Sequence, residues 1–130
     1  MKKYLPNLAG ILLGLCFLAA SIPVLFNLIS IPKLPEGTPA AHFMAAFVPT
    51  GYLKFVKMFE FVGGLLVLIP RLRNLGLLLL GPVIVNIIAF HALVDDPRHL
   101  INPMLDLIIV CALFLLWDAR RKFAGLLNSN

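Results

Sequence analysis

The sequence predicts an all-α polytopic membrane protein: a bundle of four transmembrane helices, with a short interfacial helix between the first two spans. Hydrophobic residues form 61% of the chain, charged residues form 13%, and the mean hydropathy is +0.98, outside the usual range of soluble domains. Polar, proline-containing segments divide the apolar stretches. The 130 residues leave room for about four spans of roughly 20 residues, so we expect a single domain over residues 1–130.

The first apolar stretch predicts a span over residues 7–30, with a bend near Pro23. The basic start and "LAAS" are also typical of a secretory signal. Because the apolar run continues through "VLFNLIS", we expect an uncleaved transmembrane helix instead.

A short helix is predicted over residues 39–48, after the polar loop "IPKLPEGTP". Thr38 suits its N-cap and Pro39 its first position. About ten residues cannot cross a bilayer, so this helix is expected to lie at the interface or re-enter the bundle.

The remaining spans are predicted over residues 52–69, 75–93 and 103–118. Pro70 ends the second span, and "RLRN" leaves only a tight connection, so the second and third spans should be antiparallel neighbours. Asn102 and Pro103 suit the N-cap and first position of the fourth span.

The basic residues lie at the edges of the apolar stretches. They form no patch with interleaved aromatic residues, so nucleic acid is not an expected partner. Cytoplasmic loops carry the excess of Lys and Arg, which predicts cytoplasmic termini and favours a bacterial inner membrane. The cytoplasmic set would be Lys2, Lys3, Arg71, Arg73, Arg120, Arg121 and Lys122, against Lys33 and Arg98 outside.

The stretch "KFVKMFEFVGG" carries charges into the second span. Lys57, Glu60 and Gly64 share one helical face, which should point into the bundle because lipid would not solvate it. Lys54 can reach the headgroups, whereas an unpaired charge at Glu60 would cost about 2.5 to 3.5 kcal/mol. Glu60 must therefore be paired, protonated or in a wet cavity. A ligand- or partner-binding role and a purely structural buried pair both remain open.

Polar side chains from other spans should reach the same outer half of the bundle. Asn86, His91 and Asp106 therefore join Lys57 and Glu60 as candidate ligand- or partner-binding residues. Asn86 and His91 lie about 140° apart on an ideal helix, so both point inward only if a kink at Pro82 intervenes.

Asp106 and His91 each have an alternative, purely structural interpretation. Asp106 could instead be a first-turn acid stabilised by the helix dipole, by Arg98 or by His99, and His91 could be an interfacial residue at a helix end. Gly63 and Gly64 are predicted to allow close helix packing. The sequence suggests no catalytic constellation and no metal-ligand cluster.

The stretch "KFVKMFEFVGGLLVLIPRLRNLGLLLLGPVIVNIIAFH", within four short spans, resembles the DoxX and DoxX-like membrane proteins. The resemblance covers nearly the whole chain and is most specific at Lys57-x-x-Glu60-x-x-Gly63-Gly64. It implies a four-helix membrane bundle in a functionally mixed family, whose name-giving members are linked to a thiosulfate:quinone oxidoreductase. Other members are partners in membrane redox complexes or assembly factors.

The prediction is therefore an accessory or ligand-binding subunit of a membrane redox or envelope-stress system, and not an autonomous enzyme. Its outward-facing polar pocket would surround Glu60. The expected partners are the lipid bilayer and a membrane or periplasmic redox protein, with an oligomer as a further option. No cofactor is assigned firmly, although a quinone would suit the pocket. The alternatives are a quinone-interacting subunit of an oxidoreductase and, ranked lower, a small transporter or an assembly factor.

Overall fold

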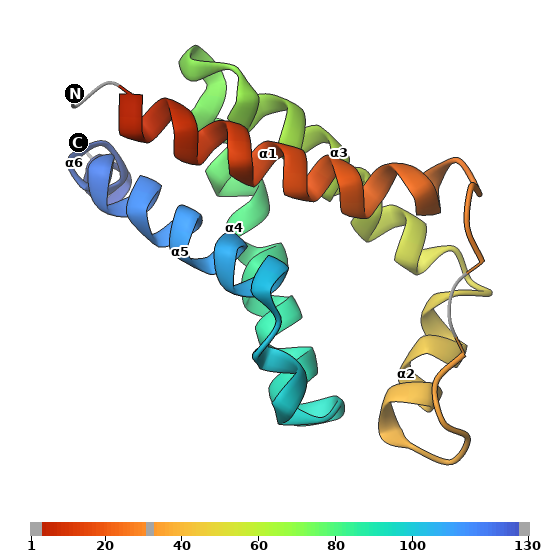
Figure 1. The fold of residues 1–130 in the computed structure, drawn as a ribbon. Coiled ribbons are helices and arrows are strands. Elements are labelled where there is room, and N and C mark those ends of the chain that lie inside the picture. The colour runs from red at the N-terminus through yellow and green to blue at the C-terminus, as the bar shows by residue number, and fades with distance from the viewer. Residues whose placement is uncertain (1–3, 31–32, 128–130) are drawn as a thin grey trace.

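The structure, a computed structural model, describes residues 4–30 and 33–127. Within these ranges the chain is helical and forms no strand, which confirms the all-α class. The α-helices are α1 (Tyr4–Leu25), α2 (Pro39–Phe47), α3 (Tyr52–Leu68), α4 (Arg73–Ala89), α5 (Pro103–Asp118) and α6 (Arg120–Ala124) (Figure 1). Four shorter helical turns, not predicted from the sequence, are η1 (Pro70–Leu72), η2 (Phe90–Val94), η3 (Pro97–Leu100) and η4 (Gly125–Leu127).

Helix α1 ends at Leu25, earlier than the predicted span over residues 7–30. Asn27 adopts the left-handed conformation with φ 55°, and the Leu28 N–H donates to the Pro23 carbonyl at 2.8 Å. This is the Schellman arrangement, in which asparagine replaces the usual glycine. The helix stops because Asn27 turns the chain, and not because the apolar run has ended.

Helices α2 and α5 begin as the sequence predicts. Thr38 Oγ1 accepts a hydrogen bond from the Ala41 N–H at 3.2 Å, and Asn102 Oδ1 accepts one from the Met104 N–H at 2.9 Å. In both helices a proline follows the cap at the start of the helix, where its missing N–H costs nothing. The bounds of α5 agree with the prediction, and α2 and α3 each end one residue earlier than predicted.

The third predicted span, residues 75–93, differs at both ends. Helix α4 begins at Arg73, and after Ala89 the chain continues as the π-helical turn η2. The Asp95 N–H donates to the Phe90 carbonyl five residues back, at 2.8 Å. A π-helical turn is wider than an α-helical turn and is often found at functional sites.

Two helical stretches of the described chain are long and apolar enough to cross a membrane by length and composition. They are Tyr4–Leu25 and Pro70–Val94, each with a mean hydropathy of 2.4. Helices α3 and α5 have 17 and 16 residues. The fold therefore contains two candidate membrane spans by this criterion.

Glycines allow close contacts on both sides of α3, which packs between α1 and α4. A methyl group at Gly14 of α1 would lie 2.8 Å from the Gly64 carbonyl oxygen, and one at Gly76 of α4 would lie 2.9 Å from the Gly63 carbonyl oxygen. Gly64 thus faces α1 and Gly63 faces α4. Small residues at these positions let the helix backbones touch.

Arg73 ties together one end of the bundle. Its side chain is buried, and its Nε donates to the Val67 carbonyl at 2.9 Å while a terminal nitrogen donates to Asn7 Oδ1 at 3.0 Å. The guanidinium also lies directly against Gly10. Arg73 is one of the predicted cytoplasmic charges. Its side chain also connects the start of α1 with the end of α3 inside the bundle.

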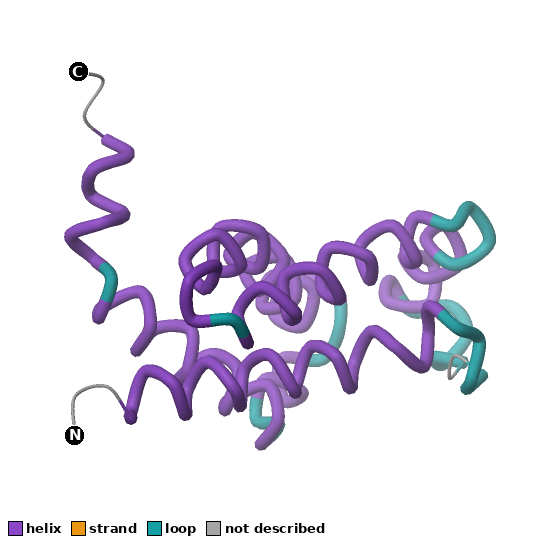
Figure 2. The backbone as a smooth tube through the Cα atoms, turned by 90° about the horizontal axis from the view of Figure 1, so that it is seen from above, coloured by secondary structure: helices purple, strands orange, loops and turns teal. Residues whose placement is uncertain are grey.

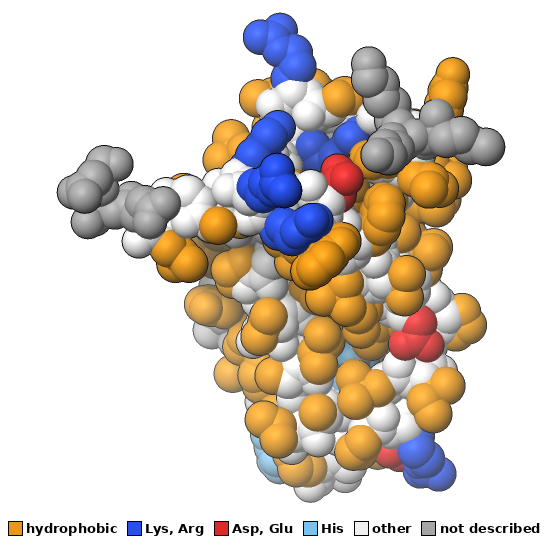
Figure 3. All heavy atoms as spheres, turned by 90° about the vertical axis from the view of Figure 1, so that its left-hand side faces the viewer, with side chains coloured by type: hydrophobic (Ala, Val, Ile, Leu, Met, Phe, Trp, Pro, Cys, Tyr) orange, Lys and Arg blue, Asp and Glu red, His pale blue; other side chains and the backbone are white. Residues whose placement is uncertain are grey.

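The two ends of the bundle differ in character. The start of α1, the α3–α4 turn and α6 lie at one end, whereas the longer loops gather at the other (Figures 1 and 2). Lys and Arg side chains cluster in the upper part of the face in Figure 3, above a largely hydrophobic surface. The predicted topology signals Lys2 and Lys3 lie outside the described residues.

Candidate functional site

A cavity of about 370 Å³ lies at the loop-rich end of the bundle, between α2, α3, α4 and α5 and against α1. Its wall is mostly apolar, with phenylalanines from α1, α2 and η2. The apolar residues are Phe17, Ala20, Phe43, Met44, Phe47, Leu53, Val56, Ile87, Phe90, Met104, Leu105 and Ile108. The polar residues are Lys57, Glu60, Asn86, His91 and Asn102. An apolar wall with a few polar groups is typical of a small-molecule site.

Glu60 is the most deeply buried of these polar groups, with 3% of its surface exposed. Lys57 Nζ lies 3.0 Å from Glu60 Oε2, on the same face of α3. Apart from this ion pair, Oε2 has no hydrogen-bond partner in the described part of the protein. The carboxylate is therefore neutralised by a neighbouring charge but is incompletely hydrogen-bonded. A buried acceptor of this kind favours an additional donor.

Asn86 and His91 both line the cavity, although about 140° separates two such positions on an ideal helix. The part of the cavity wall that α4 and η2 form is broad and contains Asn86, Ile87, Phe90 and His91. The two polar residues lie at the edges of this part of the wall. A kink at Pro82 is not needed and could not change their relative angle, because Pro82 precedes both. The predicted requirement for such a kink was wrong.

Asp106 does not line the cavity, so the structure does not bring it together with the other predicted ligand- or partner-binding residues. It is exposed in the first turn of α5, where Leu105 and Ile108 take the inward positions. This placement agrees with the alternative that the helix dipole stabilises the acid. The proposed partners of Asp106 pair elsewhere, Arg98 with Asp96 and His99 with Asp95.

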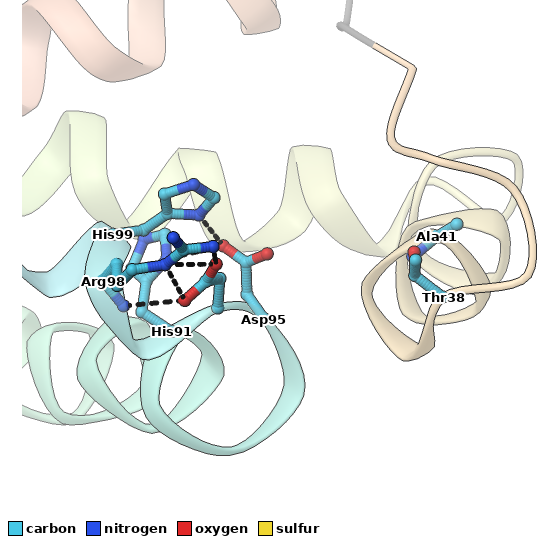
Figure 4. Close-up of polar contacts among 7 residues, drawn as sticks. Thr38, Ala41, His91, Asp95, Arg98 and His99 are labelled. Carbon is cyan, nitrogen blue, oxygen red and sulfur yellow. Dashed lines mark hydrogen bonds and ion pairs between the residues drawn. The ribbon is translucent and has the colours of Figure 1, made fainter.

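His91 also belongs to a second cluster, at the rim of the cavity. Its Nδ1 lies 3.1 Å from Asp95 Oδ2, and His99 Nδ1 lies 2.6 Å from the same oxygen (Figure 4). The hydrogen bond from His99 is the main influence that lowers the pKa of Asp95. In turn, the hydrogen bond with Asp95 raises the pKa of His99.

A separate ion pair closes the turn beside this cluster. Asp96 caps η3 by accepting the Arg98 N–H at 3.0 Å, and the Arg98 guanidinium donates to Asp96 Oδ2 at 2.6 Å. These hydrogen bonds lower the pKa of Asp96 to about 2. Arg98 and Asp96 therefore satisfy each other, which leaves Asp95 to the two histidines.

The sequence analysis missed the roles of Asp95 and His99. A signal was present, because His91, Asp95 and His99 are spaced at i, i+4 and i+8, close to the repeat of one helical face. The predicted third span ends at residue 93, so no single predicted helix contains all three residues. Asn102 was predicted as a cap and also lies on the cavity wall.

Lys57, Glu60 and His91 give the cavity groups that can donate or accept hydrogen bonds, and most of the surrounding wall is apolar. No serine, threonine or cysteine lines the cavity among the described residues. Cys16 and Cys111 are free thiols; Cys111 lies in the core, and Cys16 packs against it. The arrangement suits binding of an amphipathic molecule better than nucleophilic catalysis.

The chain is 32% identical over 99 residues to a protein of Bacillus subtilis (strain 168) called "Uncharacterized protein YwoB". The match covers 73% of this chain but only 62% of the relative's length. No protein-family model matches the chain. No solved structure matches it either.

Proposed function

We propose that this chain is a four-span membrane protein of the DoxX type that binds an amphipathic molecule in the cavity beside Glu60. The observation that carries the proposal is the Glu60 carboxylate, which is almost fully buried at the wall of an apolar cavity and, among the described residues, has Lys57 as the one polar partner of its Oε2. The sequence resemblance described above supports the assignment to this type.

The four spans would be α1, α3, α4 with η2, and α5. At a rise of 1.5 Å per residue, the 17 residues of α3 and the 16 of α5 give helices about 25 Å long, close to the thickness of the hydrocarbon core. Large apolar side chains are exposed on the outer faces of these two helices, as lipid contact requires. They include Phe55, Met58, Val62, Leu65, Leu107, Val110, Leu113 and Phe114.

Accessibility to a membrane-impermeant maleimide tests this topology. With cytoplasmic termini, a cysteine placed at Glu36 in the loop before α2 should react in intact cells, and one at Arg121 in α6 should react only after lysis. The native Cys16 and Cys111 serve as the unreactive background, because they lie within the bundle. Reaction of Arg121→Cys in intact cells, with protection of Glu36→Cys, would show the reverse orientation.

The ligand should have a lipid-soluble body and a head that donates a hydrogen bond. The phenylalanine-rich wall suits the body, and Glu60 accepts from the head while Lys57 can donate to a neighbouring oxygen. A lipid with a hydroxyl-bearing headgroup, or a reduced quinone, has this chemistry. For a quinone, the polar wall would hold the ring oxygens, and the phenylalanines would contact the ring faces and the tail.

In this role the protein is an accessory or ligand-binding subunit of a membrane redox or envelope-stress system in a bacterial inner membrane. The alternative, a quinone-interacting subunit of a membrane oxidoreductase, uses the same cavity and needs a redox protein as its partner. The poorly hydrogen-bonded carboxylate beside an apolar wall fits either assignment. The identity of the molecule that co-purifies with the chain distinguishes them.

The binding proposal is tested by purifying wild type and Glu60→Gln at equal yield and identifying the extracted lipids and quinones by mass spectrometry. Wild type should retain one enriched amphiphile, and Glu60→Gln should lose at least tenfold of it, because the amide attracts a donor less strongly than the carboxylate. Lys54→Met is the matched control, since Lys54 lies on the same helix but is exposed and outside the cavity. Identical profiles of extracted lipids and quinones for all three proteins would rule out the proposed binding site.

A further inference from the structure

We infer that His91, Asp95 and His99 form a binding site for a divalent transition-metal ion such as Zn²⁺, at the rim of the cavity. The site uses two imidazole nitrogens and one carboxylate oxygen, all within 4.8 Å of one another. It differs from the amphiphile site in its ligands and in its chemistry, although His91 contributes to both.

The three side chains already converge on one point. Nδ1 of His91 and Nδ1 of His99 approach the same oxygen, Asp95 Oδ2, at 3.1 and 2.6 Å. The imidazole planes are nearly perpendicular, at 89°, so the two rings reach that oxygen from different directions. Figure 4 shows the His99 ring turned toward Asp95. Convergence on a single point is what an ion requires, because its bonds radiate from one centre.

The two spacings to Asp95 need only a small adjustment, and the third, between the two histidine nitrogens, is within 4.8 Å. Zinc bonds to histidine nitrogen and carboxylate oxygen are about 2.0 to 2.2 Å long, which places neighbouring ligand atoms about 3 to 3.5 Å apart. The separation of 3.1 Å between His91 and Asp95 already lies in this range. The 2.6 Å separation between Asp95 and His99 would lengthen by less than about 1 Å. The metal would replace the shared protons, so the histidines would bind it as neutral ligands.

The local backbone can accommodate this adjustment. His91 belongs to the π-helical turn η2 and His99 to η3, and these two turns pack against each other. The side chain of His99 is 59% exposed, so it can move without disturbing the core. Its exposure also leaves open coordination positions for water.

The surrounding charges favour this choice of ligands. Arg98, a permanent cation adjacent to His99 in the chain, is held by Asp96, so its charge is largely balanced. Asp95 contributes one negative charge, and the two imidazoles favour a borderline ion such as Zn²⁺ over the hard cations Mg²⁺ and Ca²⁺, which prefer oxygen ligands.

The test is titration of the purified, full-length protein with Zn²⁺ by calorimetry, using a chain without a polyhistidine tag. Wild type should bind about one Zn²⁺ per chain, and His99→Ala should lower the affinity more than tenfold, because changes to outer-shell groups alone often cost 10- to 100-fold. His42→Ala is the matched control, because His42 is an exposed histidine on α2 outside the cluster. It should bind Zn²⁺ as wild type does, and Mg²⁺ should not compete.

A second readout separates metal loss from misfolding. His99→Ala and wild type should have the same helical content and the same unfolding temperature without Zn²⁺, whereas added Zn²⁺ should raise the unfolding temperature only of wild type and His42→Ala. Equal Zn²⁺ affinities for wild type and His99→Ala would contradict the proposed metal site. A loss of Zn²⁺ affinity in His42→Ala equal to that in His99→Ala would also contradict it. The amphiphile test on Glu60→Gln does not involve added metal, so the two proposals can fail separately.

Discussion

Replacement of Lys57 by methionine should destabilise the protein by about 3 to 5 kcal/mol, the cost of leaving a buried charge without its partner. Lys57 Nζ lies 3.0 Å from a Glu60 carboxylate that is almost fully buried. Methionine keeps a long, unbranched side chain and removes the charge. The free energy of unfolding in mixed detergent micelles measures the effect.

Lys54→Met is the control for this experiment. It makes the same chemical change one turn earlier in α3, at an exposed position. Exposed substitutions of this kind usually change stability by less than about 0.5 kcal/mol. An equal loss of stability in both variants would show that the charge of Lys57 is needed for some reason other than Glu60.

The double variant Lys57→Met/Glu60→Gln should recover most of the lost stability, because it removes the unpaired charge together with its partner. The same variant distinguishes the two readings of Glu60. A purely structural pair predicts a stable double variant with the wild-type profile of bound amphiphile. A binding role predicts a stable double variant that has lost the amphiphile. Failure to recover stability would contradict the ion-pair account itself.

Substitution of Gly76 by alanine should destabilise the bundle by about 1 to 3 kcal/mol, the usual cost of overpacking. The new methyl group would lie 2.6 Å from a methyl carbon of Val67 and 2.9 Å from the Gly63 carbonyl oxygen. The second neighbour is backbone, so relief requires α3 and α4 to move apart.

Gly81→Ala on the same helix provides the matched comparison. A methyl group at Gly81 has no neighbouring atom within 4 Å. Alanine favours a helix by up to about 1 kcal/mol over glycine, so this variant should be as stable as wild type or more stable. Thermal unfolding of both variants measures the difference. Equal stability of Gly76→Ala and Gly81→Ala would contradict the close α3–α4 contact.

Much of the helical pattern could be predicted because its boundaries depend on local chemistry. Thr38 and Asn102 cap their helices by hydrogen bonds to nearby backbone, and the prolines at positions 39 and 103 follow from the same rule. The inward face of α3 was predictable because the helical repeat places Lys57 and Glu60 on the same side of the helix as the two glycines. These features need no knowledge of the neighbouring helices.

Other features depend on contacts that the sequence pattern does not contain. Arg73 could be counted as a flanking charge, but its burial depends on Asn7 and on a carbonyl of α3. The π-helical turn η2 and the pairing of both His91 and His99 with Asp95 require the α4–α5 connection to fold back on itself. The exposed position of Asp106 depends on which face of α5 packs against the other helices.

Photocrosslinking in living cells tests most directly whether the Glu60 cavity holds a specific amphiphile. A photoreactive phenylalanine analogue would replace Phe47, which lines the cavity, or Phe59, which lies on α3 outside it. The account predicts one enriched adduct mass at Phe47, its loss in Glu60→Gln, and a mixture of bulk lipids at Phe59 in both backgrounds. The same lipid mixture at both positions, or a Phe47 adduct that survives Glu60→Gln unchanged, would contradict it.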